Sequence, residues 1–221
     1  MAFKAILFDM IGTTVRENDP MFITNCFITA FAEDKIDVSA SLIKMRRGQE
    51  KAAMIGDILK ELDFPQTMGP SILQRFRRNV ERGIDNFSPA EGARDIIASM
   101  MSIGIKIGIG SGLPRDVFSQ VMRYLHWEAI PFDYTGIAEE TGRGRPHPDM
   151  IFDMLTKLSL EGKDLLKVGD TVADIQEGKN AGVKTAVILA GTQPENILRT
   201  ENPDYVIHNL SELRNIFKYQ S

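Results

Sequence analysis

Three acidic residues stand where strand-like stretches of this chain end, a position that suits a nucleophile or a metal ligand. Asp9 ends the apolar stretch 5–8, Asp170 ends the stretch 165–169, and Asp174 follows four residues later. A buried parallel strand reads as an apolar run, and ligands of parallel sheets bind beyond the carboxyl ends of the strands. A carboxylate there can attack a substrate or bind a metal ion. Taken alone, Asp9 or Asp174 also fits an acid that caps a helix or stands in its first turn.

The spacing of the acids predicts a cation between them. Asp170 and Asp174 lie one helical turn apart, so both side chains can face the same cleft. Carboxylates that meet at one edge of a sheet repel one another unless a positive charge lies among them. Hard oxygen ligands, with few of them from protein, suit Mg²⁺. We therefore expect Asp9, Asp170 and Asp174 to belong to one magnesium site.

Two further fragments have residues that suit an anion. Ser111 and Gly112 follow a strand-like stretch and precede a helix opened by Pro114, so a hydroxyl and free N–H groups would meet at a helix N-terminus. Arg145 lies in the turn 144–149, whose prolines fix the backbone, and its guanidinium can neutralise a phosphoryl group. Each fragment alone also reads as an ordinary surface turn. Together with the acids, both fragments point to a single active site.

Composition excludes several classes of protein. The chain has 221 residues, a net charge of −4 and one cysteine, Cys26. The charge does not favour a nucleic-acid partner, and no apolar run reaches the ~18–20 residues that span a bilayer. A single cysteine excludes a framework of intrachain disulfides and fits a cytoplasmic protein. Its apolar neighbours indicate a packed core thiol.

Strand and helix patterns alternate over most of the chain, which predicts an α/β fold. The expected strands end near Asp9 and cover 105–111, 165–170, 184–189 and 205–207, with helical patterns between them. Alternation of this kind predicts a Rossmann-like, doubly wound parallel sheet that is covered on both faces.

One region breaks this alternation. Helical periodicity alone fills the stretch 16–87, which predicts an inserted all-helical cap domain after the first strand. The core domain would then comprise 1–15 and 88–221, with hinges near 14–19 and 86–89. The alternative is that these helices cover one face of the sheet.

The four fragments occur in the order of the four motifs of the haloacid dehalogenase superfamily. On these motifs the chain is identified as a member of that superfamily. The resemblance implies a Rossmann-like core, an inserted helical cap and Mg²⁺-dependent phosphoryl transfer through an aspartyl-phosphate. The matching residues are Asp9 with Gly12, Thr13 and Thr14, then Ser111 and Gly112, then Gly144, Arg145 and Pro146, and then Gly169, Asp170, Thr171 and Asp174.

The resemblance also implies a role for each motif residue. Asp9 would be the nucleophile and a Mg²⁺ ligand, and the carbonyl of Ile11, Asp170 and Asp174 would complete the metal site. The residues expected to bind the phosphoryl group are Gly12, Thr13, Ser111, Gly112 and Arg145.

Ile11 departs from the pattern of phosphatases in this superfamily. They usually carry an aspartate there, which protonates the leaving group and later activates water. Isoleucine does neither, and the loss of a general acid or base typically costs a factor of ~10²–10⁴ in rate. An efficient phosphomonoesterase is therefore hard to build on this motif.

The phosphonoacetaldehyde hydrolase branch does without that aspartate, because a cap lysine forms a Schiff base with the substrate aldehyde. Arg47, Gly48 and Lys51 resemble its cap element, so Lys51 would be the imine-forming residue and Arg47 and Gly48 would bind substrate. This role needs a pKa lowered from ~10.4 toward ~7–8, whereas most lysines lie on the surface. Met54 and Leu113 replace a histidine and a phenol of that branch.

We therefore expect a Mg²⁺-dependent hydrolase of a small phosphorylated or phosphonylated metabolite, most similar to phosphonoacetaldehyde hydrolase. The branch also implies a homodimer. Two alternatives stay open: a phosphomonoesterase of the phosphoglycolate phosphatase type, and a phosphometabolite-binding protein that has lost catalysis.

Overall fold

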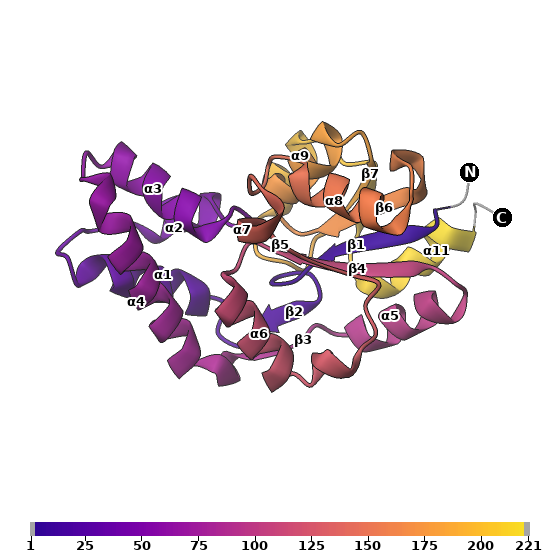
Figure 1. Cartoon of the computed structure of the whole chain (residues 1–221), viewed down its shortest axis with the longest axis horizontal. Helices are drawn as coiled ribbons and strands as arrows, with labels where there is room; N and C mark the ends of the chain where they lie inside the picture. The colour runs from indigo at the N-terminus through magenta and orange to yellow at the C-terminus, as the bar shows by residue number, and fades with distance from the viewer. Residues whose placement is uncertain (1–2, 219–221) are drawn as a thin grey trace.

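A six-stranded parallel sheet lies at the centre of the computed structural model, which describes residues 3–218 (Figure 1). The order of the strands is β5-β4-β1-β6-β7-β8, with β1 between β4 and β6. This order is the doubly wound topology that the alternating pattern predicts. The strands are β1 (Ala5–Asp9), β4 (Lys106–Ser111), β5 (Tyr134–Ile137), β6 (Leu165–Gly169), β7 (Lys184–Ile188) and β8 (Tyr205–Ile207).

Helices cover both faces of this sheet, which confirms the predicted Rossmann-like fold. Figure 1 shows α8 and α9 on one face of the sheet and α5 and α11 on the other. Sequence patterns did not predict β5, α7 or α10. The helices are α5 (Ala93–Ser102), α6 (Arg115–Tyr124), α7 (Ala138–Thr141), α8 (Asp149–Leu158), α9 (Val172–Asn180), α10 (Glu195–Thr200) and α11 (Leu213–Lys218).

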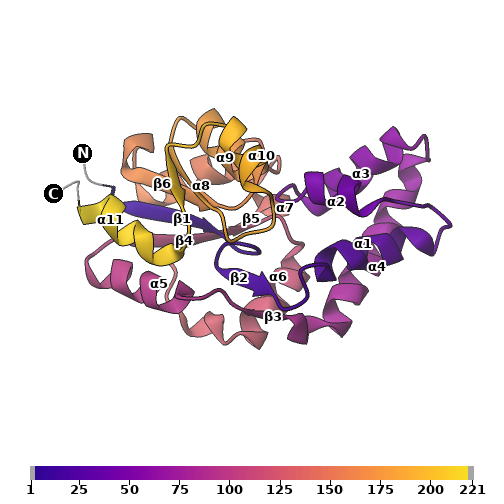
Figure 2. The same cartoon turned by 180° about the vertical axis from the view of Figure 1, so that it is seen from behind.

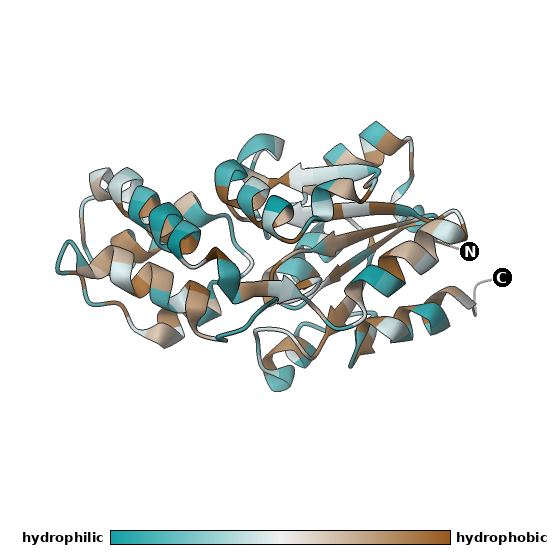
Figure 3. Cartoon of the chain, turned by 90° about the horizontal axis from the view of Figure 1, so that it is seen from below, coloured by the Kyte–Doolittle hydropathy of each residue, from teal (hydrophilic) through white to brown (hydrophobic). Residues whose placement is uncertain are grey.

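Strand β1 shows why the apolar run must be continuous. Successive side chains point to opposite faces of a sheet. Ile6 and Phe8 therefore enter one core cluster, while Ala5 and Leu7 enter another. Hydropathy colouring shows apolar strands with the polar sides of the helices outward (Figure 3). Asp9 is the first polar side chain that β1 presents, and it lies at the carboxyl end of the strand.

Four helices between β2 and β3 form what we call the helical segment, residues 22–82. They lie together beyond the carboxyl ends of the strands, seen from both sides in Figures 1 and 2, and do not cover a face of the sheet. Phe27 and Phe76 stack with ring centroids 4.0 Å apart and join the first of these helices to the last. The helices are α1 (Phe22–Ala32), α2 (Ala40–Met45), α3 (Lys51–Glu61) and α4 (Gly69–Arg82). Their division from the sheet as a separate cap domain stays a prediction.

Two short strands connect the helical segment to the sheet. β2 (Val15–Glu17) and β3 (Phe87–Pro89) pair antiparallel at the positions where the sequence predicts hinges. Three residues each are too few to show a periodicity, so the pairing was not predicted.

Cys26 is buried in α1, as its apolar neighbours predict. Burial, with a contribution from the nearby charge of Glu17, raises the pKa of its thiol to about 12. Among residues 3–218, no helix has both the length and the apolar character that crossing a membrane requires.

The turn 46–50, between α2 and α3, packs directly on loops of the sheet. A Cβ atom at Gly112 would lie 2.5 Å from the carbonyl oxygen of Gln49, and one at Gly144 would collide with the side chain of Glu50. Gln193 adds a polar bridge, since its carboxamide donates to Lys44 O at 3.2 Å and accepts from Val172 N at 2.7 Å. The backbone of the turn therefore lies as close to the sheet as glycine permits.

We expect Gly112→Ala to loosen this contact. The added methyl must displace the backbone at Gln49, and overpacking of this kind typically costs about 1–3 kcal/mol. Amide hydrogen exchange of residues 46–50 should become faster in the variant. Gly162→Ala is the matched control, because its Cβ would meet no atom nearer than 3.6 Å. Unchanged exchange in Gly112→Ala would show that the turn does not depend on this close approach.

Candidate active site

The three acids meet where β1 and β6 end. One carboxylate oxygen from each of Asp9, Asp170 and Asp174 lies within 4.8 Å of the others, and all three residues are buried. The cap of α9 holds Asp174 in place. The Thr171 hydroxyl lies 2.5 Å from Asp174 Oδ2 and accepts from the Asp174 backbone N–H at 3.3 Å. The structure thus brings together the acids that the sequence placed at strand ends.

Asp170 is held by a ring of small groups. Thr13 Oγ1 donates to its Oδ1 at 3.1 Å, and the backbone N–H and hydroxyl of Thr192 donate to its Oδ2 at 2.7 and 2.5 Å. Any side chain at Gly12 or Gly191 would collide with this carboxylate. The motif residues Gly12 and Thr13 therefore support Asp170, and their expected role in phosphate binding stays a prediction.

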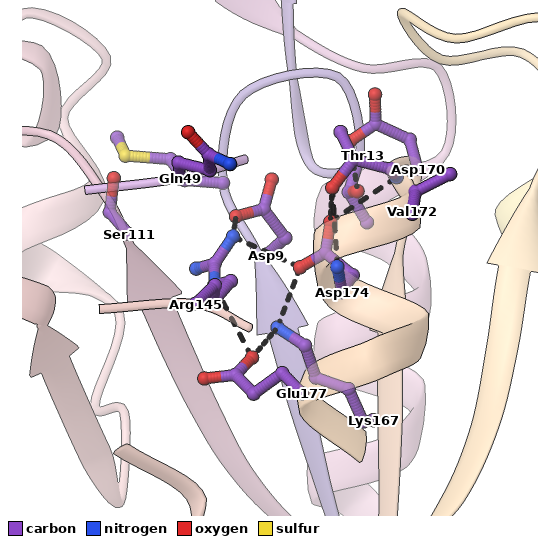
Figure 4. A network of polar contacts seen from close by, with 12 residues as sticks. Asp9, Thr13, Gln49, Ser111, Arg145, Lys167, Asp170, Val172, Asp174 and Glu177 are labelled. Atoms are coloured by element: carbon purple, nitrogen blue, oxygen red, sulfur yellow. Dashed lines mark hydrogen bonds and ion pairs between the residues drawn. The ribbon is translucent and has the colours of Figure 1, made fainter. Parts of the chain in front are cut away.

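Arg145 connects the acids to one another (Figure 4). Its Nη1 pairs with Asp9 Oδ1 and lies 2.9 Å from Asp174 Oδ1, while its Nε lies 3.3 Å from Glu177 Oε2. The side chain is 1% exposed, so water screens these pairs little. Arg145 is the residue that the sequence predicts to hold a phosphoryl group, and it lies against the expected nucleophile.

Lys167 and Glu177 complete this network, and the sequence-based prediction missed both. Lys167 Nζ lies 2.9 Å from Asp174 Oδ1 and 3.1 Å from Glu177 Oε2, and both residues are buried. A signal for each was present in the sequence. Lys167 is a charge inside an apolar strand, and Glu177 follows Asp174 by three residues on the same face of α9.

Burial and charge move the pKa values of the acids apart. Burial, with the charges of Asp9 and Asp174, raises the pKa of Asp170 to about 7. Burial also raises the pKa of Asp9, although Arg145 opposes the shift. Burial alone would raise the pKa of Asp174, but Lys167 and Arg145 outweigh it and lower the pKa below its ordinary value.

The residues present fit a divalent cation. The three acids and Glu177 bring four buried carboxylates, and Arg145 and Lys167 bring two buried cations. Two negative charges are left over when every acid is ionised, and one divalent cation balances them. Carboxylate oxygens are the ligands that hard cations such as Mg²⁺ take.

A small cavity lies beside Asp9 and gathers most of the predicted site residues. Its volume is about 30 Å³. The predicted residues that line it are Asp9, Ile11, Arg47, Gly48, Lys51, Ser111, Gly112 and Arg145. These residues come from β1 and the turn after it, from β4 and the turn after it, from the turn 46–50, from the start of α3 and from the loop before α8.

Lys51 is buried at the start of α3 and does not lie on the surface. It is 7% exposed, and its Nζ donates to the carbonyl of Gln49 at 2.7 Å. Burial, followed by the charges of Arg47 and Arg145, lowers the pKa of this amine to about 8. Glu50 caps α3 with its carboxylate, which accepts from the backbone N–H groups of residues 52 and 53. The amine is therefore partly neutral near pH 8.

Arg47 has a partner that the sequence did not indicate. Its guanidinium pairs with Glu17 of β2, and both side chains are buried. Glu17 also accepts from the backbone N–H of Ile23 at 2.8 Å. Arg47 thus lines the cavity with its charge already neutralised.

Residues 6–188 match the family described as haloacid dehalogenase-like hydrolase. The chain belongs to this family. It is therefore an enzyme of the hydrolase type, which goes against the alternative of a binding protein without catalysis. The match spans all four motif fragments and the helical segment between them.

Relatives named phosphonoacetaldehyde hydrolase are similar along most of this chain. The protein from Bacillus cytotoxicus is 27% identical, over 91% of this chain and 81% of that relative. The protein from Bacillus anthracis is 26% identical, over 98% of this chain and 89% of that relative. The dehalogenase-like family and these relatives together place the enzyme among the phosphatase-like and phosphonatase-like hydrolases.

Solved structures share the fold. A phosphonoacetaldehyde hydrolase-like protein from Oleispira antarctica superposes with a TM-score of 0.88 at 18% identity, covering 99% of this chain and 92% of its own. A hydrolase from Pseudomonas syringae gives a TM-score of 0.88 at 15% identity, covering 97% of this chain and 98% of its own.

We expect Lys167→Met to destabilise this hydrolase. Removal of the Lys167 ammonium leaves the negative charge of Glu177 less well balanced in the protein interior. Breaking a buried pair typically costs about 3–5 kcal/mol of stability. Urea unfolding measures the loss. The double variant with Glu177→Gln should recover part of it, because fewer buried charges are left unpaired. Lys184→Met, at an exposed ion pair with Asp204, is the control and should change little. An equal, small effect of both lysine variants would contradict a structural role for the network.

We expect the stability of the metal-free enzyme to fall as pH rises from about 4 to about 7. The folded state holds the pKa of Asp170 at about 7, above its ordinary 3.8, so the fold favours the protonated carboxyl and loses this contribution when Asp170 ionises. A divalent cation bound at this site, with Mg²⁺ as the probe, adds about 2.7 kcal/mol by mass action at about 100 times its Kd. A proton competes for the same carboxylate, so at a fixed Mg²⁺ concentration the rise in Tm should be larger at pH 8 than at pH 5.5. Asp170→Asn should weaken the pH dependence of the metal-free stability, while the raised pKa of Asp9 still contributes. Equal rises in Tm at both pH values would contradict the prediction.

Proposed function

We propose that this enzyme hydrolyses the P–C bond of a small carbonyl phosphonate, with Asp9 as nucleophile and Lys51 as the imine-forming amine. The observation that carries the proposal is that Asp9 and Lys51 line one small cavity, and that Ile11 lines it too. The relatives named phosphonoacetaldehyde hydrolase support the same assignment.

Asp9 and Arg145 supply the chemistry at phosphorus. An oxygen of Asp9 attacks phosphorus and forms an aspartyl-phosphate, which water then hydrolyses. The Arg145 guanidinium, which now pairs with Asp9, presents a fork of donors that matches phosphoryl oxygens. Ser111 ends β4 beside the cavity and adds a hydroxyl. Both donors would stabilise the negative charge that shifts onto the phosphoryl group during attack.

Lys51 supplies the electron sink for the carbon fragment. Its neutral amine adds to the substrate carbonyl and loses water to form an imine. When the P–C bond breaks, its electron pair moves into the imine and gives an enamine. The leaving group is then a carbon stabilised by nitrogen and needs no acid on oxygen. The absence of a carboxyl group at position 11 is consistent with this chemistry.

We also propose that Mg²⁺ is the resident cation. Asp9, Asp170, Asp174 and the carbonyl of Ile11 would hold it with oxygen ligands alone. When bound, it would neutralise charge on the phosphoryl group. Thr13 and Thr192 fix Asp170 in the orientation that this role needs.

Substrate entry requires the helical segment to act as a cap that moves. The cavity of about 30 Å³ has the space of about one water molecule, and a phosphonate is larger. The turn 46–50 and Lys51 form its cover, and both belong to the stretch between the paired strands β2 and β3. We therefore propose that the segment swings on these strands, admits substrate and closes to exclude water.

We expect borohydride to trap an adduct of phosphonoacetaldehyde at Lys51, found by mass spectrometry, together with phosphate release. The trapping rate should rise with pH through about 8, where the pKa of Lys51 lies. Lys51→Arg keeps the charge but forms no imine, so adduct and phosphate should both fall by a factor of ~10²–10⁴ or more. Lys60→Ala, at an exposed residue of the same helix, should leave both unchanged.

Asp9→Asn separates the two halves of the reaction. This variant should still give the Lys51 adduct but release no phosphate, because the nucleophile at phosphorus is gone. Phosphate release that survives Lys51→Arg would overturn the imine mechanism. In that case the phosphoglycolate phosphatase alternative would be tested next, with phosphoglycolate as substrate.

A further inference from the structure

Apolar side chains make up most of the cavity lining apart from the groups that would react. We call them the apolar wall: Ile11, Ile23, Phe27, Ile43, Met54 and Leu113. Helices α1, α2 and α3 contribute four of them, and the remaining two follow β1 and β4. Five are at most 3% exposed, and Ile11 is partly buried. Whatever part of a substrate meets this wall loses its contact with water.

The apolar wall is held in place by packing. Phe27 stacks on Phe76 with an angle of 16° between the rings. Ile43 and Met54 are 0% and 1% exposed and belong to the main core cluster. A packed wall of this kind does not rearrange easily to admit a group of another shape.

The cations of the cavity are already engaged. Arg47 pairs with the buried Glu17, and Arg145 pairs with Asp9. Lys51 is the amine that would react. Within residues 3–218, no other lysine, arginine or histidine lines this cavity. A carboxylate on the carbon part of a substrate would find no free cation and would lose its hydration.

We propose that the apolar wall binds a short alkyl group on the carbonyl carbon, so that the enzyme accepts 2-oxoalkyl phosphonates and rejects carbonyl phosphonates that carry a carboxylate. This inference rests on the proposed function and adds the substrate class. The small size of the cavity favours a short alkyl group over a long one. Met54 and Leu113 are the residues that determine the preference, since both line the cavity together with Lys51 and Ser111.

The reaction balances with water alone. Lys51 condenses with the ketone and releases one water, and Asp9 then takes the phosphoryl group as the P–C bond breaks. The carbon atom that carried phosphorus takes up a proton. One water then releases the ketone product from Lys51. A second water releases phosphate from Asp9. The net reaction consumes one water and needs no oxidant or reductant.

The test compares two substrates that differ at one group. 2-Oxopropylphosphonate, called the methyl ketone below, carries a methyl group on its carbonyl carbon. Phosphonopyruvate carries a carboxylate at the same place. We expect kcat/KM for the methyl ketone to exceed that for phosphonopyruvate by about 100-fold, because only the carboxylate loses hydration without a partner. Phosphonoacetaldehyde serves as the reference, and borohydride trapping at Lys51 is followed for all three.

Two variants test the wall itself. Met54→Gln and Leu113→Asn each place an amide in the wall, and each should lower the preference for the methyl ketone at least tenfold. Met122→Gln makes the same exchange at a buried methionine of α6 outside the cavity and should leave the preference unchanged. Because the readout is a ratio of two substrates, a general loss of folded enzyme does not move it.

The outcomes separate the two proposals. Adducts at Lys51 with all three compounds, and equal kcat/KM for the methyl ketone and phosphonopyruvate, would overturn the inference and leave the proposed function standing. A preference that survives Met54→Gln and Leu113→Asn would overturn the role of the wall. No adduct with any compound would overturn the proposed function, and the inference with it.

Discussion

Four carboxylates buried in one cluster repel one another, and the architecture of the site is a response to that repulsion. Arg145 touches Asp9, Asp174 and Glu177, and Lys167 touches the last two. Two cations cannot balance four acids, so the site is built to take a further positive charge. The parallel sheet brings the elements that must converge for this to one edge. They are the ends of β1 and β6 and the loop that carries Arg145.

The same edge of the sheet also decides how closely the helical segment approaches. Glycines at the sheet loops allow the turn 46–50 to lie on the backbone itself, and this close fit places Lys51 in the interior. Burial then lowers the pKa of Lys51 to about 8, which lies within the range of a general base near neutral pH. Backbone contact, burial of the amine and its lowered pKa therefore form one chain of cause and effect.

Much of the fold and of the site could be predicted from the sequence, because apolar runs that end in polar residues report parallel strands directly. The edge strand β5 was missed because Thr135 and Gly136 interrupt its apolar pattern. Lys167 and Glu177 were missed because the sequence does not show whether a charged residue in a strand or on a helix is buried and paired or exposed. The partner of Arg47 was also invisible, since Glu17 lies 30 residues away in a three-residue strand. Pairings between distant segments depend on packing, which local patterns do not encode.

The burial of Cys26 has a practical consequence. The chain has no other cysteine, and this thiol lies in the interior of α1 with its pKa raised to about 12, so it reacts poorly with thiol-directed labels. Two cysteines introduced on exposed faces, one on the helical segment and one on the sheet side, would therefore carry fluorophores almost exclusively. Single-molecule energy transfer between them would follow the separation of the helical segment from the sheet through a catalytic cycle, and Cys26 would not have to be replaced first.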